Sequence, residues 1–205
     1  RHALGLEPAN RVFAYNLLYG LQAAGGRQEA ILALLEALPA ELGRDPELAA
    51  FAPQALADLG RIDEACARYE ALCAAGGLAA DAVTSYLDLL WGQDRQEEAL
   101  GLRERHPALA ALVPVRHHLA HLLIEAGRGA EALADLERLA GRGDDEVAII
   151  LLARALAATG DEVGAHDRLE AWLRRRPRSA AVWSERGWLA VRLGWLPQAR
   201  TAFER

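Results

Sequence analysis

A histidine-rich segment, residues 117–125, holds the side chains with the greatest chemical potential in this chain. His117, His121 and Glu125 follow one another at intervals of four residues, so in a helix they lie along one face. Two imidazoles and a carboxylate on one face could hold a divalent metal ion. His118, however, stands where the metalloprotease motif requires a glutamate. The pattern favours polar histidines that titrate near neutral pH, and we expect neither a metal site nor a cofactor.

Other motifs of catalysis are absent from the sequence. It contains no phosphate loop, dinucleotide-binding fingerprint, nucleophilic serine elbow or paired-cysteine metal motif. Cys66 and Cys73 fall in one expected helix, which separates their Cα atoms by roughly 10 Å. A disulfide needs less than about 7 Å, so both are expected to be small buried residues. The sequence therefore predicts no enzymatic activity.

The composition is that of a soluble globular chain. Of the 205 residues, 52% are hydrophobic and 25% are charged, with a formal net charge of -6. No basic run is long enough to follow a phosphate backbone, so nucleic acid is not an expected partner. No apolar stretch approaches the roughly 18–20 residues of a membrane-spanning helix. The absence of lysine and the abundance of alanine, leucine and glycine indicate a high-GC bacterial source, with cytoplasm and periplasm both left open.

A short signature recurs every 33 to 35 residues, and it consists of a glycine or aspartate followed five residues later by an alanine. The six copies are Gly25/Ala30, Gly60/Ala65, Asp94/Ala99, Gly127/Ala132, Gly160/Ala165 and Gly194/Ala199. A period of this length indicates stacked helical repeats. The glycine suits the left-handed end of a first helix. The alanine is expected where the second helix lies closest to the first.

Between the signatures, apolar residues follow a helical period and predict two helices per repeat. The predicted pairs are 11–24 with 27–39, 46–59 with 62–75, 80–92 with 96–106, 113–126 with 129–140, 146–159 with 162–175, and 180–193 with 196–205. Pro53 should kink the first helix of the second pair, and Pro107 should shorten the second helix of the third. Residues 1–205 are predicted to form a single domain, with repeats at 11–45, 46–79, 80–112, 113–145, 146–179 and 180–205.

Both ends of the chain interrupt a repeat. Residues 1–8 have the pattern of the tail of a preceding second helix, and residues 201–205 that of the middle of one. Neither end has the polar capping helix that repeat arrays normally carry. We therefore expect a fragment of a longer array, whose exposed apolar faces at residues 1–20 and 185–205 could pair between copies to form a homodimer.

The sixth repeat carries the clearest family pattern. It runs from Val182 to Ala190 and continues with Gly194, Ala199 and Phe203. This order of large residue, small residue, glycine, alanine and aromatic resembles the tetratricopeptide repeat family, and the resemblance extends over essentially the whole chain. It implies an all-α fold, a right-handed α-solenoid (superhelix) of tandem helix-turn-helix repeats.

In that family the first helix of each pair lines a concave groove that holds a partner polypeptide. The resemblance implies a groove row of Tyr19, Gln54, Asp88, His121, Arg154 and Trp188. A second row one turn earlier would comprise Tyr15, Ala50, Thr84, His117, Ile150 and Ser184, and Trp91 would extend the groove. Aromatic and arginine side chains are the expected energetic anchors. The candidate binding residues are Tyr15, Tyr19, Gln54, Asp88, Trp91, His117, His121, Arg154 and Trp188.

The leading hypothesis is a non-enzymatic scaffold that binds a segment of a partner protein in this groove. Some family members hold the C-terminal carboxylate of a chaperone with a clamp of lysine and asparagine, and the absence of lysine disfavours that ligand here. Two alternatives stay open. The chain could be the substrate-recognition arm of a larger glycosyltransferase, sulfotransferase or hydroxylase, or the periplasmic repeat region of a polysaccharide-export protein.

Overall fold

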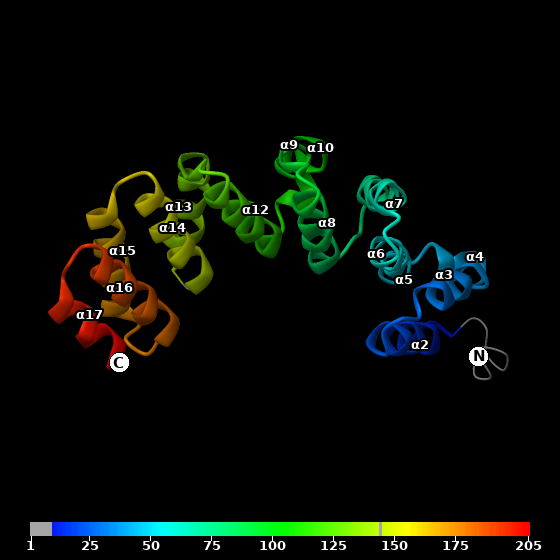
Figure 1. Cartoon of the computed structure of the whole chain (residues 1–205), viewed down its shortest axis with the longest axis horizontal. Coiled ribbons are helices and arrows are strands. Elements are labelled where there is room, and N and C mark those ends of the chain that lie inside the picture. Colours follow the sequence, from blue (N-terminus) through cyan, green and yellow to red (C-terminus); the bar gives the residue numbers. More distant parts are fainter. Residues whose placement is uncertain (1–9, 144) are drawn as a thin grey trace. The chain divides into compact units, whose positions relative to one another are not determined.

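The computed structural model describes residues 10–143 and 145–205, which form helices joined by short turns (Figure 1). Contacts divide the chain into two units, Arg1–Val115 and Arg116–Arg205. No strand occurs among the described residues, and the predicted all-α fold of tandem helix pairs is confirmed. The predicted tail of a preceding repeat, residues 1–8, lies outside the described residues. None of the described helices has the length and apolar content needed to cross a lipid bilayer.

In the first unit, α2, the α5–α6 segment and α8 are the first helices of the predicted pairs. The helices of this unit are α2 (Arg11–Ala23), α3 (Gln28–Glu36), α4 (Ala40–Gly43), α5 (Pro46–Ala49), α6 (Phe51–Asp58), α7 (Ile62–Ala75), α8 (Ala80–Gly92), α9 (Gln96–Leu100), α10 (Leu102–Arg105) and α11 (Pro107–Ala110). Helix α3 packs against both α2 and α6, and α7 packs against both α6 and α8. Each of these two second helices is therefore held between the first helices of two successive repeats.

In the second unit, α12, α14 and α16 are the first helices. The elements are α12 (Val113–Glu125), which begins in the first unit, the 3₁₀ helix η1 (Gly129–Ala132), α13 (Leu133–Gly141), α14 (Glu146–Ala158), α15 (Glu162–Arg175), α16 (Ala180–Arg192) and α17 (Leu196–Phe203). Consecutive helices from α13 to α17 pack against one another, and α14 also contacts α16. The second unit thus repeats the packing of the first.

The predicted left-handed residue at the end of each first helix is confirmed. The φ angles are 75° at Gly60, 57° at Asp94, 72° at Gly127, 93° at Gly160 and 75° at Gly194. At each turn the next residue donates its N–H to the carbonyl five residues earlier, which is the hydrogen bond of a Schellman motif. The signature alanines of these five repeats are at most 3% exposed. The turn therefore brings each alanine into the contact between the paired helices.

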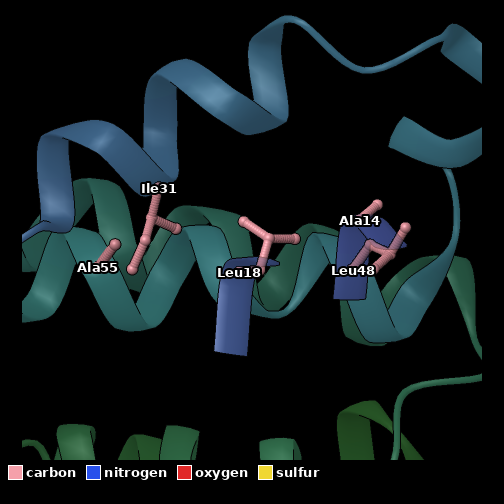
Figure 2. Close-up of a cluster of buried hydrophobic side chains, with 5 residues drawn as sticks. All are labelled: Ala14, Leu18, Ile31, Leu48 and Ala55. Atoms are coloured by element: carbon pink, nitrogen blue, oxygen red, sulfur yellow. The ribbon is translucent and has the colours of Figure 1, made fainter. Parts of the chain in front are cut away.

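The first pair departs from the predicted register by one residue. Both Gly25 and Gly26 have positive φ, 64° and 61°, so this turn contains one more left-handed residue than the others. One residue rotates a helix by about 100°, and as a result Ile31 is buried while Ala30 is only half-buried. Figure 2 shows Ile31 directed from α3 toward the helix that carries Ala55. Ala30 is therefore not buried as the other signature alanines are, and Ile31 is the buried residue that follows this turn.

The predicted helix 129–140 begins as the 3₁₀ helix η1 and continues as α13, and two further predicted helices are interrupted near a proline. The predicted helix 46–59 is divided at Ala50 into α5 and α6. The break lies next to Ala49, and Pro53 has no N–H to donate to the carbonyl of that residue. The predicted helix 96–106 is divided at Gly101 and ends at Arg105, before Pro107 begins α11. Both prolines therefore act as expected.

Polar side chains cap several first helices at a repeating position. Each accepts a hydrogen bond from a backbone N–H two or three residues later, as Ser, Thr, Asp and Asn do at helix starts. The capping residues are Asn10, Asp45, Asp145 and Ser179. These caps fix where the first helices begin, and the glycine signature alone did not reveal them.

Replacing Asp94 by glycine should stabilise the chain. Asp94 is the one described residue other than glycine with positive φ, and Asp94→Gly removes the strain that a Cβ brings to this conformation. We expect an increase of about 0.5–1 kcal/mol in the free energy of unfolding, measured by urea denaturation followed by circular dichroism. Gly60→Ala, at the equivalent turn, should lower stability by about 1 kcal/mol. A loss of stability in Asp94→Gly would show that the aspartate side chain itself holds the turn.

Candidate functional site

A pocket of about 340 Å³ lies in the first unit, on the side formed by the first helices. Helix α2 contributes Tyr15, Tyr19 and Gln22, and α6 contributes Phe51 and Gln54. The rest of the wall comprises Pro46, Glu47, Ala50, Tyr69, Ala79, Asp81, Ala82 and Ser85. These residues come from three successive repeats, so the pocket forms only when the repeats pack together.

Aromatic rings form part of the pocket wall. The rings of Tyr15 and Tyr19 are nearly parallel, with an interplanar angle of 11° and centroids 6.4 Å apart. Phe51 meets Tyr15 edge-on, at 76° and 5.7 Å. Tyr19 is 61% exposed and Tyr15 is 37% exposed. Part of this aromatic surface is therefore accessible to a partner.

Tyr69 reaches the pocket from α7 and is only 2% exposed. Its ring stacks on Tyr86 with centroids 5.1 Å apart, and its hydroxyl donates to Oε1 of Gln54 at 3.4 Å. The amide of Gln54 donates in turn to Asp58 at 3.1 Å. Burial, with a smaller contribution from the Asp58 carboxylate, raises the pKa of Tyr69 to about 12. The phenol therefore remains protonated near neutral pH and orients Gln54.

The structure brings together some of the predicted groove residues of the first unit. Tyr15, Tyr19 and Gln54 line the pocket. Asp88 is exposed and Trp91 is partly buried, and both lie farther along α8 and outside the wall of the pocket. The pocket thus meets α8 only near its N-terminal end, at Asp81, Ala82 and Ser85, before Asp88 and Trp91.

In the second unit, Arg154 is engaged by a residue of the next repeat. It donates from Nε and Nη2 to the two carboxylate oxygens of Glu185, at 3.0 and 2.6 Å. These bonds to Glu185 raise the pKa of Arg154 above its usual range. The predicted cationic anchor is therefore already paired within its own unit.

Trp188 presents the most exposed aromatic surface among the described residues of the second unit. Its side chain is 62% exposed, and its ring meets Phe203 of α17 edge-on at a centroid distance of 5.4 Å. A Cβ at the neighbouring Gly187 would lie 2.6 Å from Cε1 of Phe203. The glycine therefore permits the close approach of α17 to α16 that supports the Trp188 ring.

The histidines of α12 do not converge as a metal site would require. Nε2 of His117 lies 2.8 Å from Asp145, the cap of α14, and the His117 side chain is only 15% exposed. His121 instead lies 3.5 Å from Glu125 on its own helix and is 45% exposed. His117 therefore joins neighbouring repeats, while His121 stays accessible on the helix surface.

In the described part of the chain, one group brings three potential ligand atoms within 4.8 Å, namely His166, Asp167 and Glu170. Arg186 donates to Nε2 of His166 at 3.1 Å and lies 3.4 Å from Glu170. Arg174 donates to the other oxygen of Glu170 at 2.9 Å. Two guanidinium groups occupy Nε2 of His166 and both carboxylate oxygens of Glu170, and their positive charge repels a cation. We therefore interpret the group as an ion-pair network.

Two acidic residues of the pocket, Glu47 and Asp81, were not among the predicted site residues. They occupy equivalent positions in successive repeats, one turn before Ala50 and Thr84 of the second predicted row. Extending the rows by one more turn toward the start of each first helix would have found both. Tyr69 offered no such signal because it belongs to a second helix.

The pKa of His166 can be tested directly. Burial and the neighbouring Arg186 lower this pKa below 6.5, so folding favours the neutral imidazole. As pH falls, His166 is protonated in the unfolded chain before it is protonated in the folded chain. Its contribution to folding stability is therefore fully present above about pH 6.5 and is lost as the pH falls below that value. A titration by nuclear magnetic resonance should therefore give a midpoint below 6.5, and Arg186→Gln should raise it.

Arg192→Gln, which removes another arginine of α16, is the matched control and should leave the midpoint of His166 unchanged. A midpoint at or above that of an unfolded peptide would contradict the burial of His166 against Arg186.

Comparison with known proteins supports the sequence resemblance. A model of the family described as tetratricopeptide repeat matches residues 123–189. No curated protein matches the chain by sequence.

Several solved structures share the fold. A tetratricopeptide repeat protein from Parabacteroides merdae is 17% identical with a TM-score of 0.63, over 93% of this chain and 78% of that one. A thermophilic tetratricopeptide repeat protein of Thermus thermophilus is 18% identical with a TM-score of 0.56, over 89% and 100%. A double mutant of MamA RS-1 is 16% identical with a TM-score of 0.55, over 78% and 92%. The chain therefore has the tetratricopeptide repeat fold, and residues 123–189 match the tetratricopeptide repeat family by sequence.

Proposed function

We propose that this chain is a non-enzymatic scaffold that binds a segment of a partner polypeptide at the pocket of the first unit. One observation carries the proposal: Tyr15, Tyr19 and Gln54, which lie on first helices of successive repeats, line one pocket. The tetratricopeptide repeat fold is suited to this role, because stacked repeats present extended surfaces for binding.

The pocket is held in shape before any partner arrives. Tyr15 packs against Phe51, and the buried Tyr69 holds Gln54 by a hydrogen bond. A surface ordered in advance loses less conformational entropy on binding. The exposed ring of Tyr19 then provides a large contact area with few rotatable bonds, which is typical of an energetic anchor.

We propose a secondary role for the corresponding face of the second unit. Trp188 is exposed there and can contact an apolar side chain. Arg154 is a weaker candidate, because a partner carboxylate would have to displace Glu185 from a two-pronged ion pair. The first unit is therefore the primary binding surface in this proposal.

The proposal predicts that Tyr19→Ala weakens peptide binding. Random dodecapeptides displayed on phage are selected on the chain, and their affinities are measured by fluorescence anisotropy. Removing a central aromatic anchor should reduce affinity by more than about tenfold. Because Tyr19 is 61% exposed, its removal should leave the helical signal in circular dichroism unchanged.

Val163→Ala is the matched control, since Val163 is also an exposed apolar residue, 51% accessible, but belongs to the second helix α15. The affinity of this variant for the selected peptides should equal that of the unmodified chain. Selected peptides that bind Tyr19→Ala as tightly as the unmodified chain would move the binding surface elsewhere.

A further inference from the structure

Apart from tyrosines, the pocket wall contains two ionisable residues, and both are acidic. They are Glu47 and Asp81, and among the described residues no arginine or histidine lines the pocket. The chain has 23 arginines, many of them beside carboxylates. The pocket therefore presents negative charge to an occupant.

The carboxylate of Asp81 is available for a partner. Asp81 is exposed, and in the described part of the chain no ion pair or hydrogen bond to its carboxylate occurs; only its backbone carbonyl accepts, from Thr84 and Ser85. Asp81 lies in the first turn of α8, which has no side-chain cap. Its charge therefore offsets the positive end of that helix dipole.

Glu47 belongs to a cluster that keeps a net negative charge. Arg11 donates to Asp45 at 2.6 Å and to Glu47 at 2.5 Å. One guanidinium thus serves two carboxylates. Glu47 is half-exposed, with 53% of its side chain accessible, so it can accept a further hydrogen bond from a cation in the pocket.

The aromatic surface beside these carboxylates also favours a cation. The faces of tyrosine and phenylalanine rings carry negative electrostatic potential and attract ammonium and guanidinium groups. Tyr15, Tyr19 and Phe51 lie in the same pocket wall as Glu47 and Asp81. Such a wall can hold both the alkyl stem and the charged head of a basic side chain.

We propose that the pocket receives an arginine or lysine side chain of the partner segment, with its stem against the aromatic rings and its head against Asp81 and Glu47. This inference rests on the proposed function and names the chemistry of the partner. An acidic segment is repelled by both carboxylates. A purely apolar segment would bury the two carboxylates without giving them a hydrogen bond or a counter-charge, which is unfavourable. The volume of about 340 Å³ suits one long side chain and its flanking backbone.

The test uses dodecapeptides selected on the unmodified chain. Selected sequences should share one arginine or lysine position. Replacing that residue in a peptide by citrulline, which has the shape of arginine without its charge, should weaken binding to the chain about fivefold. Asp81→Asn should weaken binding of the arginine peptide by a similar factor. The citrulline peptide and Asp81→Asn combined should weaken binding by less than the product of the two separate factors, because both changes remove the same interaction.

Asp63→Asn is the matched control, since it removes one carboxylate of α7 that is fully exposed and lies outside the pocket. It should leave the affinity unchanged. Glu47→Gln provides a second variant that is independent of α8, and it should also weaken the arginine peptide and spare the citrulline peptide.

The outcomes separate this inference from the proposed function. Peptides whose binding depends on Tyr19 but that share no basic residue would overturn the inference and leave the proposed function standing. Equal affinities of arginine and citrulline peptides would do the same. If no selected peptide depends on Tyr19, both the inference and the proposed function fail.

Discussion

Reversal of the chain after each first helix requires a residue in the left-handed conformation, and the other features of the repeats follow from that turn. The turn aims the second helix back along the first, and it places a small residue at their closest contact. In three repeats the next residue is an arginine that pairs with a glutamate three residues later, Arg61 with Glu64, Arg95 with Glu98 and Arg128 with Glu131. The start of the second helix is thus supported by a local ion pair within its own first turn.

Polar and charged side chains then join one repeat to the next. Arg11 bonds to the cap of α5, His106 lies 2.7 Å from Glu70 of α7, and Arg154 bonds to Glu185 of α16. Many of these basic groups are paired with carboxylates of their own unit. A carboxylate that has no basic group to itself is therefore a distinctive feature of the surface. At the pocket of the first unit, that surface is Asp81 together with the shared carboxylate Glu47.

The pocket illustrates how the surface chemistry of a repeat fold varies from one repeat to the next. Its lining comes from equivalent positions in successive repeats, yet the side chains there differ: Tyr15 is replaced by Ala50 one repeat later, and Glu47 by Asp81. The backbone provides the same frame in each repeat. Variation at a few positions of that frame gives the first unit a pocket with aromatic and acidic side chains. It gives the second unit an exposed Trp188 and the ion pair of Arg154 with Glu185.

The sequence by itself determined the helix pairs, their turns and the face on which Tyr15, Tyr19 and Gln54 lie, because helical period and glycine conformation depend on local backbone preferences. It did not determine that Ile31, and not Ala30, is the buried residue after the first turn, since two adjacent glycines permit more than one turn. Only the tertiary structure decided that Arg154 pairs with Glu185 and that Asp81 faces the same pocket as Tyr19. These contacts join residues that are tens of positions apart in the sequence, and only the packing of the helices brings such residues together.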